Sequence, residues 1–446
     1  MAQMEQQLEQ HVPQMAISAS TQELAALIDA HLGALRSPSP AWRVGDSPIS
    51  GRGVFAARNI EKGEELFREH TLLVGPTAHR GRNLRTCIHC YHQPPGESEE
   101  SALCSAGCGL PVCPDCAPSE RHAVECQLFR KWQPKHLSII EPRALRILSV
   151  VRCFFLSEPQ RQLLYAMQAN TDRYYMREVQ RAAECFEHFP RDPDMLEYFY
   201  RTVCAFNTNA FESRCHIDGQ EVVTRALFPL AGLLNHQCTP NAAHHFEDGE
   251  TIVVTATERI PAGAEITMSY TKLLWSTLAR KIFLGMTKHF MCQCPRCQDP
   301  TENGTYLSAL FCREQGCKGL VIPVQTKTLQ PDWRCLSCEN VFPHAKMARY
   351  QDFALNTINN RINTCSVRDM IHFINELCPR FCPPSNYVLI EAKLNVIWRM
   401  TRIGAEEYTP EELAHKDRYR EEILAILHKL GAGECTLKKL INEEIQ

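Results

Sequence analysis

The stretch Ala231-Gly-Leu-Leu-Asn-His-Gln-Cys-Thr-Pro-Asn-Ala242 places three kinds of chemistry directly after an apolar run. An Asn-His pair supplies hydrogen-bonding groups, a cysteine supplies a thiolate, and Pro240 gives a rigid turn. A core helix needs none of these groups, and the proline would break one. Taken alone, the stretch also fits a helix or strand that ends in a turn and carries an incidental free cysteine.

Two later segments favour a functional interpretation: Glu265-Ile-Thr-Met-Ser-Tyr270 and Cys292-Gln-Cys-Pro-Arg-Cys297. A structural zinc ion normally takes four ligands, so three closely spaced cysteines form an incomplete tetrahedral site. Cys238 is the obvious candidate for the fourth ligand. A shared zinc would hold the Asn-His turn against the end of the domain, with Tyr270 between the two.

In their order and spacing these motifs resemble the SET family of protein lysine methyltransferases. The motifs that carry the resemblance are Asn235-His236-x-Cys238-x-Pro240-Asn241, the strand ending at Tyr270, and Phe290-x-Cys292-x-Cys294-x-x-Cys297. The resemblance implies a β-rich SET core, S-adenosylmethionine as cofactor, and a protein lysine as methyl acceptor.

Composition limits the alternatives. The chain has 446 residues, 44% of them hydrophobic, which suffices for roughly two or three domains with cores of their own. A net charge of −3 gives no general reason to expect nucleic acid binding. No apolar stretch reaches the about 18 residues of a transmembrane helix, and no secretory signal is evident. We therefore expect an intracellular monomer, in the cytoplasm, the nucleus or both, that binds neither membranes nor specific nucleic acid.

Cysteine is abundant, with 23 residues, and residues 87–126 gather eight soft metal-binding side chains in four pairs. Reduced thiols at paired spacings indicate metal sites, here two tetrahedral zinc ions. A segment this short has too small a core to fold alone, so metal binding would supply its folding energy. The alternative, accidental richness in cysteine, does not explain the pairing. The predicted ligands are Cys87, Cys90, Cys104, Cys108, Cys113, Cys116, His122 and Cys126.

This segment resembles a MYND finger, although several of its spacings depart from that pattern. The finger family's cross-braced pairing implies one zinc on Cys87, Cys90, Cys113 and Cys116. It implies a second zinc on Cys104, Cys108, His122 and Cys126. We expect the neighbouring His89 and His92 to be exposed loop residues. A finger inserted after the first SET strands is the layout of the SET and MYND domain-containing (SMYD-type) protein lysine methyltransferases. Such a finger implies proline-containing peptide partners.

A further zinc site is predicted at Cys312-x4-Cys317 with Cys335-x2-Cys338, where Gly316 and Trp333 resemble a zinc ribbon. At four ligands for each zinc ion, this site, the two of the finger and the one predicted at Cys238, Cys292, Cys294 and Cys297 give about four zinc ions.

The resemblance also implies the cofactor site. Gly51-Arg52-Gly53 matches the family's opening Gly-Arg-Gly, where the missing Cβ lets the backbone approach a ligand, although a plain hairpin turn is the alternative. For Asn170 the alternative is a surface helix position, and for Asn209 and Phe211 it is a turn with a core phenylalanine. The implied cofactor residues are Ser50, Gly51, Arg52, Gly53, Asn170, Asn209, Asn235, His236, Tyr270 and Phe290.

Tyr270 and Phe211 are the residues that the resemblance implies for the transfer itself. A lysine must lose its proton before it can attack a methyl group, and an apolar channel lowers its pKa. Tyr270 would position the methyl group and the amine, while Phe211 would line the channel. Relatives often carry tyrosine where this chain has Lys288, and a cation there would oppose a charged substrate. We expect Lys288 to turn outward and cap the cofactor carboxylate. The alternative function is a silent scaffold that binds proline-containing peptides.

The predicted class is α+β, with a β-rich core split by the finger and a helical insert. Thr21–Arg36 is predicted to be a helix with Thr21 as N-cap, Ser157-Glu-Pro159 to begin another, and Thr409-Pro-Glu-Glu412 a third. Residues Arg143–Leu156 suggest a buried helix. The predicted boundaries are 1–40 N-terminal extension, 41–86 first part of SET, 87–126 finger, 127–206 helical insert, 207–275 SET core, 276–300 post-SET zinc region, 301–344 zinc-ribbon-like segment and 345–446 helical TPR-like domain.

Overall fold

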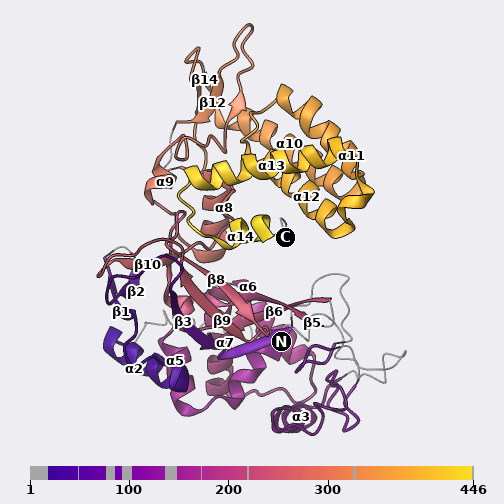
Figure 1. Ribbon diagram of the computed structural model, residues 1–446. Coiled ribbons are helices and arrows are strands. Elements are labelled where there is room, and N and C mark those ends of the chain that lie inside the picture. The colour runs from indigo at the N-terminus through magenta and orange to yellow at the C-terminus, as the bar shows by residue number, and fades with distance from the viewer. Residues whose placement is uncertain are drawn as a thin grey trace.

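The computed structural model describes residues 19–48, 50–76, 86–92, 103–135, 148–171, 173–217, 220–324 and 328–443. Helices and sheets alternate along the chain, which confirms the predicted α+β class (Figure 1). Most of the predicted tail of residues 1–20, and the first part of the helix expected from Arg143, lie outside the described residues. Within these described ranges, no helix has the length and apolar character needed to cross a membrane.

Three small sheets form the β-rich core, in the orders β1-β2-β10-β7, β3-β9-β8 and β4-β6-β5. Among the described residues, four strands precede the finger and six follow the helical insert, so the core is split as expected. The strands are β1 (Trp42–Ser47), β2 (Gly51–Ala56), β3 (Glu65–His70), β4 (Leu73–Pro76), β5 (Phe211–Ile217), β6 (Gln220–Leu227), β7 (Asn235–His236), β8 (Ala242–Glu247), β9 (Thr251–Ala256) and β10 (Glu265–Met268).

The register of the first sheet places the Asn-His motif beside the strand that leads to Tyr270. Strand β7 runs parallel to β10, with Asn235 opposite Thr267 and His236 opposite Met268. On its other side β10 pairs antiparallel with β2, the strand that begins with the Gly-Arg-Gly segment. Three motifs far apart in the sequence are therefore neighbours in one sheet.

The helices cover this core and form the C-terminal part. They are α2 (Thr21–Leu32), α3 (Glu120–Trp132), α5 (Glu158–Ala166), α6 (Arg173–Glu184), α7 (Pro193–Asn209), α8 (Thr277–Lys288), α9 (Pro295–Gln298), α10 (His344–Thr364), α11 (Val367–His372), α12 (Tyr387–Ile403), α13 (Pro410–Lys429) and α14 (Thr436–Glu443). Shorter turns of 3-10 or π type are η1 (Gly33–Leu35), η3 (Arg152–Phe155), η4 (Ala231–Leu233), η5 (Phe373–Leu377), η6 (Cys378–Arg380) and η7 (Ala405–Glu407).

Helix starts follow their capping chemistry, with one correction. Ser20, and not Thr21, caps α2: its hydroxyl accepts from the Glu23 N–H, and the Glu23 carboxylate accepts from the Ser20 N–H. The predicted helix starts at Ser157 and Thr409 are confirmed, and both residues belong to capping boxes. Helix α2 buries Leu24, Ile28 and Leu32 in the core, so it packs on the SET strands as expected.

The C-terminal part begins with a four-stranded sheet and continues with helices α10 to α14, above the core in Figure 1. Its strands are β11 (Leu310–Phe311), β12 (Leu320–Pro323), β13 (Trp333–Cys335) and β14 (Val341–Phe342). The last segment of the chain returns to the core, because the Glu434 N–H donates to the Thr257 carbonyl at 3.1 Å. The Thr436 hydroxyl donates to the His244 carbonyl in β8 at 3.1 Å. The helical part is thus fixed against the sheets that carry the motifs.

Candidate functional site

A buried carboxylate anchors the chain where the Asn-His motif begins. Glu69 in β3 is fully buried and accepts the backbone N–H groups of Leu230 at 2.8 Å and Ala231 at 2.9 Å. His31 of α2 lies 3.4 Å from the same carboxylate. The stretch forms the short helix η4 followed by the strand β7. Glu69 fixes the point where the chain turns into the motif.

Asn235 ties the motif to the Gly-Arg-Gly segment. Its side-chain amide donates to the Arg52 carbonyl at 3.0 Å and to the Glu265 carboxylate at 2.6 Å. A Cβ on Gly53 would lie 2.5 Å from that carboxylate and 2.9 Å from the amide nitrogen, so only glycine fits. The close approach predicted for a ligand is therefore made at Gly53 by the protein itself. Gly51, with φ +78° and open space at its Cβ position, faces no such contact.

His236 bridges a cysteine and Tyr270. Its Nδ1 accepts the backbone N–H of Tyr270 at 3.0 Å, so the ring proton of the neutral form resides on Nε2. Nε2 lies 3.2 Å from the Cys238 sulfur. Burial lowers the pKa of His236 to about 4, which keeps the imidazole neutral near pH 7. One ring therefore holds the thiol group and the backbone of Tyr270 in fixed relation.

Tyr270 is held at both ends. Its backbone N–H donates to His236, and its hydroxyl donates to the Leu234 carbonyl at 2.7 Å. Burial, together with the nearby Glu265 carboxylate, raises the pKa of Tyr270, so the phenol stays protonated. The expected outward orientation of Lys288 is wrong, since its ammonium lies 5.4 Å from the centre of the Tyr270 ring. That ammonium donates to the Thr208 carbonyl at 2.6 Å.

The structure brings Cys238, Cys292, Cys294 and Cys297 together. Their sulfur atoms all lie within 4.8 Å of one another, and three of the four residues are buried. The Cys238 sulfur is 3.4 Å from that of Cys297 and 3.9 Å from that of Cys292. A compact set of four thiols is a donor set that suits tetrahedral zinc. We call these residues the core cysteine group.

Two buried arginines surround the core cysteine group. Arg280 is fully buried, with Nε 3.2 Å from the Cys238 sulfur and Nη1 3.2 Å from the Glu302 carboxylate. Arg296 donates to the Cys238 carbonyl at 3.0 Å, and burial lowers its pKa to about 10. Four thiolates outweigh one Zn²⁺ by about two negative charges, and the guanidinium groups of Arg296 and of Arg280, which also pairs with Glu302, offset part of that excess.

Several predicted cofactor residues gather around the segment after α5. Arg52 donates to the Ala166 carbonyl at 2.6 Å, and the Asn209 side chain donates to the Gln168 carbonyl at 2.7 Å. The Asn170 N–H donates to the Thr208 hydroxyl at 2.9 Å. Nη1 of Arg52 is buried without a hydrogen-bond partner among the described residues. An anionic group of a ligand, such as the carboxylate of S-adenosylmethionine, would satisfy it.

Three predicted residues lie at the edge of this arrangement or outside it. Ser50 is exposed, and its N–H donates to the Ser47 hydroxyl at 3.2 Å. The Phe290 ring is 37% exposed and lies 6.0 Å from the His236 ring. Phe211 packs edge-on against His244 at 5.5 Å. His244 lines the cavity of about 470 Å³ described below, whereas Phe211 does not line it. Phe211 therefore packs behind His244 and is separated from the cavity by that ring.

A cavity of about 470 Å³ opens beside the segment that carries Tyr270; both chain neighbours of Tyr270 line it, and Tyr270 itself does not. The cavity lining includes Ser269 and Thr271 on one side, and Leu394 and Trp398 of α12 on the other. The cavity therefore lies between the core strands and the C-terminal helices. An ion pair of 2.9 Å between Lys272 and Glu391, both lining residues, links the two walls.

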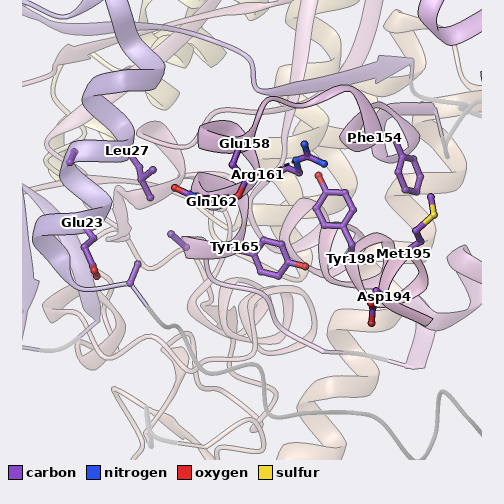
Figure 2. A pocket seen from close by; sticks show the side chains of 13 residues that line it. Glu23, Leu27, Phe154, Glu158, Arg161, Gln162, Tyr165, Asp194, Met195 and Tyr198 are labelled. Carbon is purple, nitrogen blue, oxygen red and sulfur yellow. Dashed lines mark hydrogen bonds and ion pairs between the residues drawn. The ribbon is translucent and has the colours of Figure 1, made fainter. Parts of the chain in front are cut away.

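A second cavity, of about 740 Å³, lies among α2, α5 and the start of α7. Figure 2 shows Tyr165, Tyr198 and Met195 facing it, with Glu23 and Leu27 contributed by α2. None of the predicted site residues lines it. It borders the candidate site only through Ala166, whose carbonyl accepts from Arg52.

In the finger, the structure assembles the two ligand sets in the cross-braced pairing. The first set is Cys87, Cys90, Cys113 and Cys116. The second set is Cys104, Cys108, His122 and Cys126. In each set the ligand atoms lie within 4.8 Å of one another, for example 3.7 Å between the sulfurs of Cys90 and Cys113. Both donor sets fit tetrahedral zinc.

The finger is joined to the core by a buried ion pair. Arg152 lies 2.7 Å from the Glu125 carboxylate and donates to the Val74 carbonyl at 2.6 Å. His89 lies 3.4 Å from the same carboxylate, and its side chain is 6% exposed, so the expectation of an exposed His89 is wrong. His92 is exposed as expected.

The fourth cysteine set forms at the end of the small C-terminal sheet. Cys312, Cys317, Cys335 and Cys338 place their sulfurs within 4.8 Å of one another. The Cys312 sulfur is 3.7 Å from that of Cys338, and the Cys317 sulfur is 3.6 Å from that of Cys335. We call these residues the ribbon cysteine group. As a donor set it also fits zinc.

Comparison with known proteins agrees with this architecture. A family model described as SET domain matches residues 51–271. The SET domain-containing protein SmydA-8, isoform B, of Drosophila melanogaster is 81% identical over 433 residues, covering 97% of each chain. This chain belongs to the SMYD-type SET domain family. Isoform A of the same fly protein is 62% identical over 430 residues, covering 95% of this chain and 92% of the relative. Mouse histone-lysine N-methyltransferase SMYD3 is 26% identical over 282 residues, covering 58% of this chain and 61% of the relative.

Sequence reasoning missed several residues that shape this SMYD-type site. Glu265 is the first residue of the motif that ends in Tyr270, but no sequence pattern indicated that its carboxylate accepts a hydrogen bond from Asn235. Arg296 stands inside the Cys-Pro-Arg-Cys segment, and that position was the available signal for its role. Arg280 lies on α8 with no motif around it, so only the fold reveals its contact with Cys238.

Proposed function

We propose that this chain is an S-adenosylmethionine-dependent protein lysine N-methyltransferase. The observation that carries the proposal is the His236 bridge, which joins Cys238 to the backbone of Tyr270. Zinc at the core cysteine group would thereby fix the tyrosine beside the Asn235 motif. The SET domain match, and the similarity to a mouse protein named as a histone-lysine N-methyltransferase, support this assignment.

The cofactor would bind along the Gly-Arg-Gly segment and the chain after α5. The unpartnered Nη1 of Arg52 would receive its carboxylate, and Asn170, Asn209 and Asn235 would supply polar contacts. The half-exposed ring of Phe290 would cover the adenine. When bound, S-adenosylmethionine supplies an activated methyl group.

The acceptor lysine would arrive through the cavity of about 470 Å³ beside the segment that carries Tyr270. Burial of the amine beyond this cavity would keep it neutral, and the protonated hydroxyl and the ring of Tyr270 would orient it. Because His244 separates Phe211 from that cavity, Phe211 would shape the channel through His244. The substrate class is a protein lysine side chain, with no specific nucleic acid or membrane involved.

A second candidate function is a silent scaffold, and the inward ammonium of Lys288 favours it. In that case the finger would bind proline-containing peptides without any transfer. With either function we propose about four zinc ions in all, one on each described cysteine-rich set. We also propose a monomer that works inside the cell, with the domain boundaries given above.

Two measurements separate the candidates. Isothermal titration should show S-adenosylmethionine binding, and a labelled-methyl assay on a lysine peptide array should show transfer. Tyr270→Phe removes the hydroxyl that bonds Leu234 and should lower transfer by about a hundredfold or more, with cofactor binding retained. Tyr350→Phe, at a partly exposed ring on α10, is the matched control and should leave transfer unchanged. Binding without transfer by the wild-type protein would favour the scaffold.

A further inference from the structure

Lys288 is the last residue of α8, and its side chain reaches the candidate acceptor end of the site. Its ammonium lies 5.4 Å from the centre of the Tyr270 ring and donates to the Thr208 carbonyl at 2.6 Å. Thr208 immediately precedes the predicted cofactor residue Asn209 in α7. The charge therefore stands between the tyrosine proposed for the acceptor and a residue proposed for the cofactor.

The groups around Lys288 do not neutralise it. Arg225 of β6 acts on it as a second cation, and the phenol of Tyr270 is neutral there. Glu265 of β10 already accepts from Asn235 and from the Ser47 hydroxyl. Within the described ranges of the chain, no carboxylate lies within ion-pair distance of the Lys288 nitrogen. The contacts that hold the ammonium are one carbonyl and the face of one ring.

We propose that Lys288 determines which acceptor amines this site takes, because its ammonium excludes a second ammonium from the space beside Tyr270. Two cations in one poorly solvated pocket repel each other strongly. An acceptor would enter as a neutral amine, and transfer would become efficient once Lys288 itself is uncharged. Amines that lose their proton readily would be preferred. This inference rests on the proposed function.

The direction of the pH effect follows from burial. Burial, with Arg225 as the second cause, lowers the pKa of Lys288 to about 8, whereas an ordinary lysine has a pKa of about 10.4. Near pH 7 roughly one molecule in ten would carry a neutral Lys288, and near pH 9 most would. The apparent kcat/KM is proportional to the fraction of molecules in which Lys288 is neutral. The charge of Lys288 alone would therefore reduce kcat/KM about tenfold near pH 7.

Two substitutions test this directly. Lys288→Met keeps the unbranched side chain as far as Cε and removes the charged nitrogen, while Lys288→Arg keeps the charge at every accessible pH. On a lysine peptide taken from the array, the kcat/KM of Lys288→Met should exceed that of the wild-type protein about tenfold near pH 7. The ratio should fall to about one above roughly pH 9, because the wild-type lysine is then neutral. Lys288→Arg should remain low throughout.

A second readout does not depend on transfer. In protein labelled with ¹³C at lysine Cε, the signal that disappears in Lys288→Met should titrate near pH 8. S-adenosylhomocysteine affinity, measured by calorimetry, should be similar for the wild-type protein and Lys288→Met, which shows that the cofactor end is intact. A matched acceptor peptide with thialysine, whose amine is less basic, should gain most over lysine in the wild-type protein near pH 7.

Three results would overturn the inference. The first is a Lys288 signal that titrates like an ordinary lysine, and the second is a lower kcat/KM for Lys288→Met at every pH. The third is methyl label on Lys288 itself, which would make this lysine an acceptor. Absence of transfer by both the wild-type protein and Lys288→Met, with Lys288 still titrating near pH 8, would instead refute the proposed function on which the inference rests.

Discussion

The core and ribbon cysteine groups have the same four-thiol ligand set in very different surroundings. In the core group, Arg280 and Arg296 bond to Cys238, whose sulfur also faces His236. In the ribbon group, Cys338 is exposed, and within the described part of the chain the sulfurs contact other cysteines and local backbone N–H groups. The ligand set is therefore no guide to what a site does.

The contacts one step away from the sulfurs make the difference. The ribbon group closes a small sheet whose strands pair only with one another. The core group joins β7, the loop after β10 and the end of α8, because His236 connects Cys238 to the Tyr270 backbone. Groups that bond metal ligands orient them and are often as important as the ligands themselves. On this view only the core group organises the candidate site.

The largest expected difference comes from removing one ligand from each group. Cys297→Ser should release about one zinc and weaken S-adenosylhomocysteine binding by at least about a hundredfold, because the Asn-His turn loses its anchor. Cys335→Ser, at an equally buried ligand of the ribbon group, should also release about one zinc while cofactor affinity stays within about twofold.

Metal counting by mass spectrometry and calorimetry with S-adenosylhomocysteine measure these two effects separately. Near-ultraviolet circular dichroism checks that each variant keeps a packed core. Equal loss of cofactor binding in Cys297→Ser and Cys335→Ser would break the comparison, since both groups would then support the site.

The next effect tests the charge around the sulfurs. Arg280→Met removes a fully buried cation and leaves the Glu302 carboxylate and the Cys238 sulfur without their shared partner. Breaking a buried ion pair from one side typically costs about 3–5 kcal/mol of stability. Arg334→Ala, beside a ribbon ligand but exposed, should change stability by no more than about 0.5 kcal/mol.

Urea unfolding of both variants at equal zinc content gives the comparison. A loss for Arg280→Met as small as that for Arg334→Ala would show that the buried guanidinium does not stabilise the core group. The zinc content is measured alongside, because loss of metal from Arg280→Met would add to the unfolding effect.

The sequence predicted this fold well where the chemistry is local. The helix starts at Ser157 and Thr409 and the mixed class all depend on neighbouring residues, and all are confirmed. The N-cap of α2 was placed one residue late, because Ser20 and Thr21 are both good caps and only the pairing of Ser20 with Glu23 decides between them. Paired cysteine spacings identified the ligands, and the cross-braced pairing implied by the resemblance to a MYND finger assigned those of the finger to the two sets that the structure brings together.

The rest of the site depends on contacts between distant segments, which spacing does not encode. Arg280 is 42 residues from Cys238, and Asn235 is 183 residues from the Arg52 carbonyl that it holds. Lys288 was expected to avoid the site because an inward cation is unfavourable, yet the end of α8 directs it over Tyr270. His89 was taken for a loop residue because the carboxylate that faces it, Glu125, gave no signal in the sequence.

A smaller effect is expected from two matched glycines. In Gly53→Ala the new methyl group would lie 2.5 Å from the Glu265 carboxylate, so Asn235 and Glu265 must shift. We expect S-adenosylhomocysteine affinity to fall about tenfold, equivalent to about 1.4 kcal/mol, with the zinc content unchanged. In Gly319→Ala the methyl group would lie 2.6 Å from the Cys335 sulfur, so the ribbon zinc should weaken and cofactor affinity should not change. The reverse pattern, with Gly319→Ala lowering cofactor affinity, would connect the ribbon to the site.

The smallest effect concerns the order in which zinc leaves the wild-type protein. A chelator reaches the ribbon group through the exposed Cys338, whereas the core group is enclosed by Arg280 and Arg296. Under mild chelation, followed with a colorimetric zinc indicator, the ribbon zinc should therefore leave before the core zinc. S-adenosylhomocysteine binding should persist through that early release, because no ribbon ligand contacts the residues that hold Tyr270. A parallel decline of cofactor binding and early zinc release would mean that burial does not protect the core zinc, and the distinction between a local and an organising zinc would fail.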